Sequence, residues 1–215
     1  MTPSSRTKRT QRADAAFNRE AIIAATASAL ATNPDASIDD IASAAGLSRR
    51  ALYGHFSGRD ELVEQTLIRG AERLAASVSA VTHPDARVEL ALLGASLWAE
   101  VEHTRAIAHL AIRGPHRVRV SEALAPLRTR LESTIKRGVH DRDIRTDILP
   151  TTLARLVEGA ALTVLDEATR TRMSRQRGHR LIVLTSLSTA GMSWRAADEL
   201  VETHSVLHVS AGANS

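Results

Sequence analysis

The chain has 215 residues, of which 43% are hydrophobic and 24% are charged, and it contains no cysteine. This composition excludes disordered and collagen-like chains, and the lack of cysteine excludes disulfide scaffolds, thiolate metal sites and cysteine nucleophiles. The formal net charge is +4, and the excess lies in the first twelve residues, which contain Arg6, Lys8, Arg9 and Arg12 but no acid. Such a segment is typical either of a solvated terminus or of an arm that contacts a phosphate backbone.

Two sequence features bear on membranes and secretion. Apolar runs such as Leu181 to Leu184 are far shorter than the ~20 residues that a membrane-spanning helix requires. The basic start followed by the apolar run 21–31 leaves a signal peptide as an alternative, but Asp14, Arg19 and Glu20 place charges where its apolar region should begin. We therefore expect a cytoplasmic protein without membrane contact.

The pattern predicts an all-α fold of about nine or ten helices, because only five residues are aromatic and no segment alternates apolar and polar positions. A first helix is expected over residues 18–32, where Asn33-Pro34 stops it. A short helix over 38–45 is capped by Ser37 with Asp40, and Gly46 ends it. A third helix is expected over 48–56, before Ser57-Gly58.

The remaining pattern predicts long helices. The fourth helix has an apolar stripe at Val63, Leu67, Ala71, Leu74 and Val78 and ends near residues 82–84. Further helices are expected over 85–102, 104–113, 121–137, 151–169, 178–191 and 194–206, separated by Gly114-Pro115, Gly138 and the segment 171–178.

Residues 38–56 fit a helix-turn-helix better than an ordinary helical hairpin. Ala42 is small enough for the next helix to cross it, and Gly46 permits a turn with positive φ. Ile41, Leu47 and Leu52 can fill the wedge between the helices. The outer face of the second helix offers hydrogen-bond donors, which suit phosphates and base edges: Ser48, Arg49, Arg50, Tyr53 and His55.

This segment resembles the signature of the TetR family of bacterial transcriptional repressors. The resemblance is carried by the run SIDDIASAAGLS at 37–48, ALYGHF at 51–56 and RDEL at 59–62, and it covers about residues 18–65. It implies an all-helical homodimer that binds a double-stranded DNA operator and responds to a small-molecule effector. The remaining residues agree with that family only in the number and length of their helices.

The candidate DNA contacts follow from position and from the resemblance. Arg50, near the start of the helix that would enter the major groove, is expected to read guanine, with Arg49 as the next candidate. Ser37 and Ser48, at helix N-termini, can donate to phosphates. The resemblance implies phosphate contacts for Tyr53, His55 and Arg59, and the basic residues Arg6, Lys8 and Arg9 complete the set.

Three domains are expected: a basic flexible arm (1–17), a helix-turn-helix DNA-binding domain (18–60) and a helical ligand-binding and dimerisation domain (61–208). The last two long helices are apolar on more than one side, which indicates either burial within one chain or a four-helix dimer interface. A head of this size reads one half-site, so we favour the dimer. Its expected interface residues are Leu153, Leu156, Val157, Ala160, Val164, Leu184 and Leu187.

The body should contain a mostly apolar ligand cavity, and the candidate residues for orienting its ligand are Trp98, His103, His109 and Glu158. The alternative for each of them is an ordinary core or surface residue. His204 and His208 have a spacing compatible with a metal, but no third ligand is in view, so we expect no metal and no cofactor. Motifs for catalysis are missing. The expected function is a ligand-released repressor of a palindromic operator; the alternative is a helical small-molecule-binding protein or enzyme with a vestigial helix-turn-helix.

Overall fold

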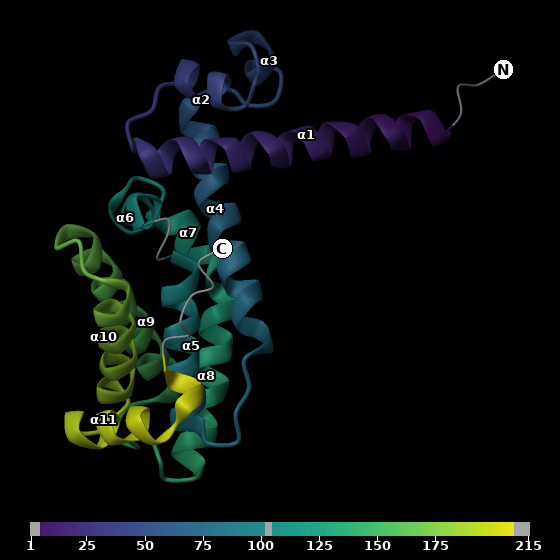
Figure 1. Cartoon of the computed structure of the whole chain (residues 1–215). Coiled ribbons are helices and arrows are strands. Elements are labelled where there is room, and N and C mark those ends of the chain that lie inside the picture. The colour runs from purple at the N-terminus through teal and green to yellow at the C-terminus, as the bar shows by residue number, and fades with distance from the viewer. Residues whose placement is uncertain (1–4, 102–104, 209–215) are drawn as a thin grey trace. The chain divides into compact units, whose positions relative to one another are not determined.

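The computed structural model describes the backbone of residues 5–101 and 105–208 and the side chains of residues 18–100 and 107–208. This part of the chain forms eleven α-helices and contains no strand (Figure 1). The α-helices are α1 (Ser5–Thr32), α2 (Ile38–Ala44), α3 (Arg49–Tyr53), α4 (Arg59–Ser77), α5 (Ala86–Val101), α6 (Arg105–Arg113), α7 (Arg117–Ala123), α8 (Ala125–His140), α9 (Pro150–Arg170), α10 (Arg175–Thr189) and α11 (Trp194–Thr203). Two short 3₁₀ turns, η1 (Val78–Ala80) and η3 (Ser205–Leu207), complete the set. The all-α expectation is confirmed.

The contacts divide the chain into two compact units, Met1–Gly70 and Ala71–Ser215. We call the first the head and the second the body. The boundary falls within α4, about ten residues beyond the boundary expected from the sequence.

The head is built around one small apolar core. Its fully buried side chains come from every helix of the unit, so that α1, the α2–α3 pair and the first turns of α4 share them. These side chains are Ile22, Leu30, Ile41, Leu52, Phe56 and Leu62. The expected wedge residues Ile41 and Leu52 are fully buried, and Ala42 is 3% exposed, as its role beneath a crossing helix requires.

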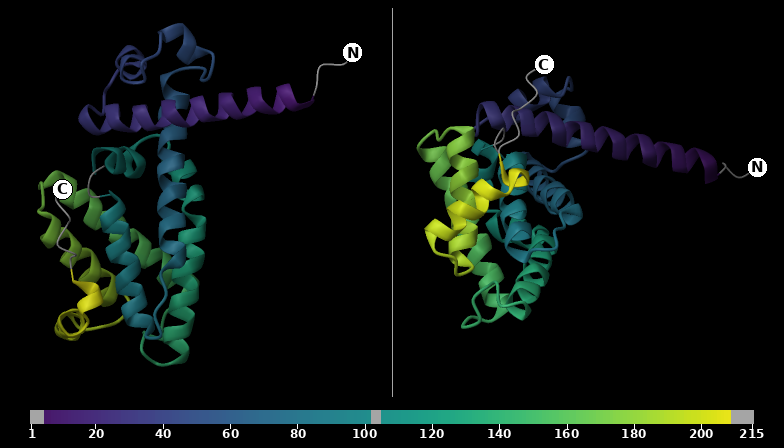
Figure 2. Two further views of the ribbon diagram at one scale, coloured as in Figure 1. Left: turned by 45° about the vertical axis from the view of Figure 1, so that its right-hand side comes forward. Right: turned by 60° about the horizontal axis from the view of Figure 1, so that its bottom comes forward.

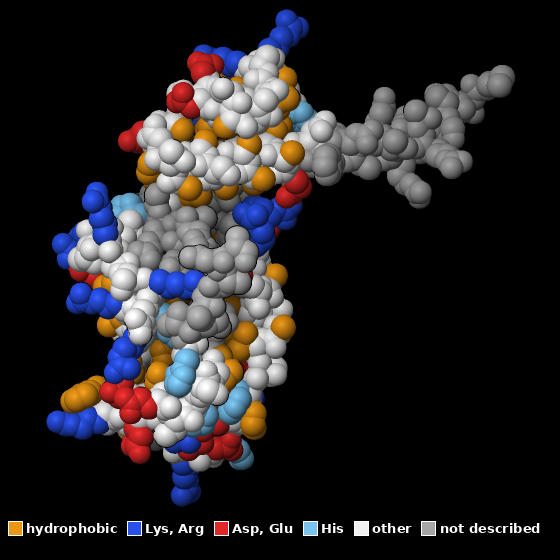
Figure 3. Space-filling model, in the orientation of Figure 1, with side chains coloured by type: hydrophobic (Ala, Val, Ile, Leu, Met, Phe, Trp, Pro, Cys, Tyr) orange, Lys and Arg blue, Asp and Glu red, His pale blue; other side chains and the backbone are white. Residues whose placement is uncertain are grey.

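The body packs long helices against one another. In it α10 contacts α5, α9 and α11, and α9 also contacts α6 and α8. The two views in Figure 2 show α9 and α10 side by side, with α5 next to them. Over the coloured part of the face shown in Figure 3, acidic and basic side chains are interspersed. No helix among the described residues is long and apolar enough to cross a membrane.

Three expected boundaries were wrong. Helix α1 begins at Ser5 rather than near residue 18, so the expected flexible arm is helical from that residue on. Residues 5–17 contain no glycine or proline, and nothing in them breaks a helix. Helix α3 ends at Tyr53. The helix expected over 121–137 is two helices, because Pro126 lies at the start of α8 and favours a new helix there.

Candidate nucleic-acid interface and interior hollow

Helix α2 begins with a complete capping box. The Ser37 Oγ accepts a hydrogen bond from the Asp40 backbone N–H at 3.2 Å, and the Asp40 carboxylate accepts from the Ser37 backbone N–H at 2.8 Å. The Ser37 hydroxyl also donates to Asp40 at 2.7 Å. These hydrogen bonds from Ser37 lower the pKa of Asp40. The expected cap is confirmed, but it uses the hydroxyl proton with which Ser37 would contact a phosphate.

Helix α3 is held by a turn and a cap. Gly46 has φ +66°, the left-handed conformation that its expected role requires. The Ser48 side chain then accepts from the Ala51 backbone N–H at 3.2 Å, which leaves its hydroxyl proton available to a ligand. The short helix is therefore fixed at its start by its own residues.

The outer surface of α3 combines a tethered and an untethered arginine. The Arg49 guanidinium donates to Asp39 of α2 at 3.0 Å and to the Tyr53 hydroxyl at 3.4 Å. Within the described residues, the Arg50 guanidinium makes no hydrogen bond or ion pair, and Arg50 is exposed. Tyr53 is 45% exposed although it is a large aromatic residue. The surface thus presents a cation that the described residues of the head do not neutralise.

Two further arginines hold the scaffold beneath this surface. Arg59, expected from the sequence to contact phosphate, instead donates to the carbonyl oxygens of Ala36 at 2.7 Å and Pro34 at 3.0 Å. Arg19 donates to the His55 carbonyl oxygen at 2.6 Å and stacks over the Phe56 ring at 4.1 Å. Its role was not expected from the sequence, because its hydrogen-bond acceptor His55 lies 36 residues away. The side chains of the candidates Arg6, Lys8 and Arg9 lie outside the described residues.

The body contains a hollow between α5, α8, α9 and α10. The space between its atoms is about 400 Å³, part of it open to solvent. Within that space, the centre of a water molecule can occupy a volume of about 20 Å³. This is close to the room that one water needs. The lining is Leu90, Leu93, Gly94, Leu97, Leu124, Leu127, Leu131, Val157, Glu158, Ala161, Leu162 and Ser186.

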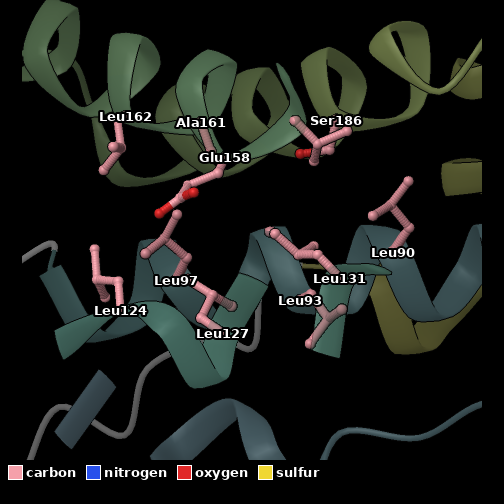
Figure 4. Close-up of a pocket in the computed structure, with 12 residues that line it drawn as sticks. Leu90, Leu93, Leu97, Leu124, Leu127, Leu131, Glu158, Ala161, Leu162 and Ser186 are labelled. Atoms are coloured by element: carbon pink, nitrogen blue, oxygen red, sulfur yellow. The ribbon is translucent and has the colours of Figure 1, made fainter. Parts of the chain in front are cut away.

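Glu158 is the one charged residue in this lining. Its carboxylate points into the hollow (Figure 4), and the residue is only 9% exposed. Arg128 donates to one carboxylate oxygen at 2.7 Å, and it also donates to the backbone carbonyl and hydroxyl oxygens of Ser121. Burial raises the pKa of Glu158, against the opposing effect of Arg128.

Two other expected ligand residues, Trp98 and His109, do not line the hollow. Trp98 is 1% exposed and packs so closely on Gly178 that no Cβ fits there, which makes it a core residue. His109 lies on the surface, where its Nδ1 is 2.9 Å from an oxygen of Asp166, a carboxylate that also accepts from Arg113. His103 lies outside the described residues.

Most of the residues expected at a dimer interface are buried within one chain. Leu153, Val157, Val164 and Leu187 are between 0% and 6% exposed, because α9 and α10 pack on each other and on α5 and α8. Their assignment to the interface was wrong. Leu156 is 47% exposed, and Ala160 and Leu184 are half-buried, while the neighbouring Leu181 is 36% exposed.

The body contains a second buried carboxylate, that of Glu89, whose burial was not predicted from the sequence. It is fully buried and accepts from Arg137 at 2.7 Å, from Thr134 at 2.6 Å and from the backbone N–H of His83 at 2.9 Å, and it forms an ion pair with Arg130 at 2.8 Å. Burial alone would raise the pKa of Glu89, but these partners lower it. Among the described residues, no group of three metal-ligating side chains occurs.

A turn with positive φ, two capped short helices and an outward row of donors define a helix-turn-helix DNA-binding head. The family model described as "Bacterial regulatory proteins, tetR family" matches residues 22–66, which lie within this head. Residues 22–66 therefore form a helix-turn-helix of the kind found in bacterial regulatory proteins of the tetR family.

Solved structures share the fold over most of the chain. The fatty acid degradation regulator FadR from Bacillus halodurans is 14% identical, with a TM-score of 0.67 over 81% of this chain and 98% of its own. FadR from Bacillus subtilis, solved with stearoyl-CoA, is 15% identical, with a TM-score of 0.66 over 80% and 97%. SmeT, the repressor of the Stenotrophomonas maltophilia multidrug efflux pump SmeDEF, is 19% identical, with a TM-score of 0.63 over 79% and 88%. No curated protein sequence matches this chain significantly.

Proposed function

We propose that the protein is a homodimeric repressor that acts in the cytoplasm, binds a palindromic operator and leaves it when a small molecule binds the body. The observation that carries the proposal is the exposed, unneutralised Arg50 on a short helix whose start is fixed by the Ser48 cap and the Gly46 turn. A guanidinium in this position can donate two hydrogen bonds to guanine O6 and N7.

The other contacts are proposed to go to phosphates. Ser48, Tyr53 and His55 offer donors beside Arg50, and Arg6, Lys8 and Arg9 add sequence-independent attraction. Arg49 is the second choice for a base contact, because it must give up Asp39 to reach one. Ser37 and Arg59 act indirectly, since their donors already hold the start of α2 and the α1–α2 connection.

A dimer is proposed through the outward faces of α9 and α10. The exposed leucines Leu156 and Leu181 lie there with Ala160 and Leu184, and the described residues of the chain leave both leucines in contact with solvent. Two copies of the head would then read two half-sites related by a two-fold axis. An interface between copies also accounts for apolar side chains that a single chain leaves in solvent.

The effector is proposed to bind in the hollow between α5, α8, α9 and α10. Its apolar lining with one buried carboxylate is typical of a small-molecule site, and the leucines must move to admit a ligand because the space as it stands holds about one water. Support comes from the similar fold of a regulator solved with stearoyl-CoA and of a repressor of an efflux pump. By linkage, an effector that releases DNA binds the free protein more tightly than the DNA-bound protein by the same factor.

Footprinting of the purified protein on DNA that flanks its own coding sequence tests the proposal. We expect one protected, two-fold symmetric segment whose protection an effector removes. Protection that is uniform along the DNA would contradict sequence-specific repression. A protected site that no compound in a broad thermal-shift screen can release would contradict the effector part alone.

A further inference from the structure

The lining of the hollow is apolar except for one carboxylate, and this combination restricts the kind of ligand that it can bind. Eleven of its twelve lining residues carry no charge: nine are leucine, valine or alanine, and the other two are Gly94 and Ser186. The remaining residue is Glu158, whose side chain is 10% exposed and whose carboxylate points inward (Figure 4). A ligand in this space meets hydrocarbon almost everywhere and one carboxylate.

Arg128 does not reverse this charge inside the hollow. It is not among the lining residues, and its guanidinium is also held by Ser121 through the backbone carbonyl and hydroxyl oxygens. Only one carboxylate oxygen of Glu158 receives a hydrogen bond from Arg128. Glu158 is therefore the charged group of the lining that a ligand meets, and one of its two carboxylate oxygens is not hydrogen-bonded to Arg128.

We propose that the ligand of this site is a lipophilic monocation, namely an apolar chain with one protonated amine that pairs with Glu158. This inference rests on the proposed function, because it names the chemical class of the effector. An ammonium group satisfies a buried carboxylate, whereas a carboxylate ligand would place two like charges close together in an apolar enclosure. The leucines of α5 and α8 accommodate the chain by rearranging, because the hollow as it stands has room for about one water.

The overall charge of the protein works against such a preference. The net charge of +4 attracts anions and repels cations at long range. A stronger affinity for the cation would therefore report the local field of Glu158 rather than general adsorption.

The test compares three probes that share one chain: n-decylammonium, n-decanol and n-decanoate, each titrated below its micelle concentration into the free full-length protein by calorimetry. We expect decylammonium to bind at least about tenfold more tightly than decanol, and decanoate to bind most weakly. Glu158→Gln should remove the preference of the cation over the alcohol and leave the affinity for decanol within about twofold. Glu167→Gln, which removes a half-exposed carboxylate of the same helix that does not line the hollow, is the matched control and should keep the preference.

Equal affinities for the three probes, tightest binding of decanoate, no binding of any probe, or an unchanged preference in Glu158→Gln would each overturn the proposal. The comparison of the three probes on the wild-type protein tests the proposed ligand class even if Glu158→Gln does not fold. Failure of the proposed function looks different: decylammonium that binds tightly without releasing footprinted DNA contradicts ligand release and leaves the ligand class intact. Release by a neutral compound, with no binding of the cation, contradicts the ligand class alone.

Discussion

The head and the body fix their functional polar groups in different ways. In the head, Ser37 and Ser48 bond to backbone groups three residues away. Among the described side chains proposed to contact DNA, those of Ser48, Arg50 and Tyr53 are exposed and that of His55 is half-buried. In the body, Glu89 and Glu158 are buried, and their arginine partners lie 48 and 30 residues away. Substitution of an exposed residue in the head should therefore change binding more than stability, whereas substitution of a buried acid in the body should change both.

The largest expected effect tests whether the body joins two heads. Leu156→Glu places a charge on the outward face of α9, and we expect the dimer to dissociate because an unpaired charge is costly in an apolar interface. Operator affinity should fall by about 10²- to 10⁴-fold, the range by which linked binding exceeds single binding. Sedimentation velocity and DNA titration measure the two effects. Val118→Glu, at a 58% exposed position of α7, is the control and should remain dimeric. A wild-type protein that sediments as a monomer would contradict the proposed dimer.

The next effect tests whether the buried acids of the body are structural. Glu89→Gln leaves Arg130 and Arg137 near a group without charge, so we expect the free energy of unfolding to fall by about 3–5 kcal/mol. Glu132→Gln removes a partly exposed ion pair with Lys136 and should change stability by about 0.5 kcal/mol or less. Denaturant unfolding of both variants measures the difference. Equal stability of the two would remove the contrast between buried and exposed acids.

A smaller effect separates reading from scaffolding within the head. Arg50→Ala should cost about 1–3 kcal/mol at the operator, relax the preference at one base pair and leave the melting temperature unchanged. Arg59→Ala should lower the melting temperature instead, because it leaves the carbonyl oxygens of Pro34 and Ala36 without their donor. Titration on operator and random DNA, together with thermal unfolding, resolves the two roles. Equal losses on both DNAs for Arg50→Ala would refute its role as a reader of sequence.

The body should also respond to acid through Glu89. Because its partners lower its pKa below the usual 4.5, the unfolded chain takes up a proton at a higher pH than the folded chain does. The stability that Glu89 contributes is therefore present above pH 4.5 and is lost as the pH falls below it. Thermal unfolding between about pH 5 and pH 3 should show a steeper loss for the wild type than for Glu89→Gln. Parallel curves would show that Glu89 is not a source of the acid sensitivity.

The smallest expected effect concerns the turn of the head. Gly46→Ala forces a side chain into φ +66°, and we expect a loss of about 1–2 kcal/mol in stability. A Cβ at this position meets no atom within 4 Å, so the loss comes from the backbone conformation alone. Gly46→Asn should lose less, because asparagine tolerates this region better. Equal melting temperatures for the wild type and Gly46→Ala would contradict the argument from φ.

The same contrast explains what the sequence could predict. The cap at Ser37, the turn at Gly46 and the buried wedge residues Ile41 and Leu52 depend on neighbours in the chain, and they were predicted correctly. The packing of α9 depends on which helices, distant in the sequence, cover each of its sides. The periodic pattern showed that one face of α9 is apolar, but it could not show whether a partner subunit or the helices α8 and α10 cover that face. Glu158 was visible as a charge in an apolar stripe, whereas Arg19 and Glu89 gave no local signal.

Selection of binding sites from a random pool of double-stranded DNA by the purified full-length protein tests the central claim most directly. We predict a two-fold symmetric sequence whose half-sites lie one helical turn of DNA, about 34–36 Å, or a multiple of it apart. The same selection with Arg50→Ala should lose one symmetric base position and keep the spacing. Recovery of no common sequence, or of a single asymmetric half-site, would contradict the claim that this protein reads DNA as a dimer through α3.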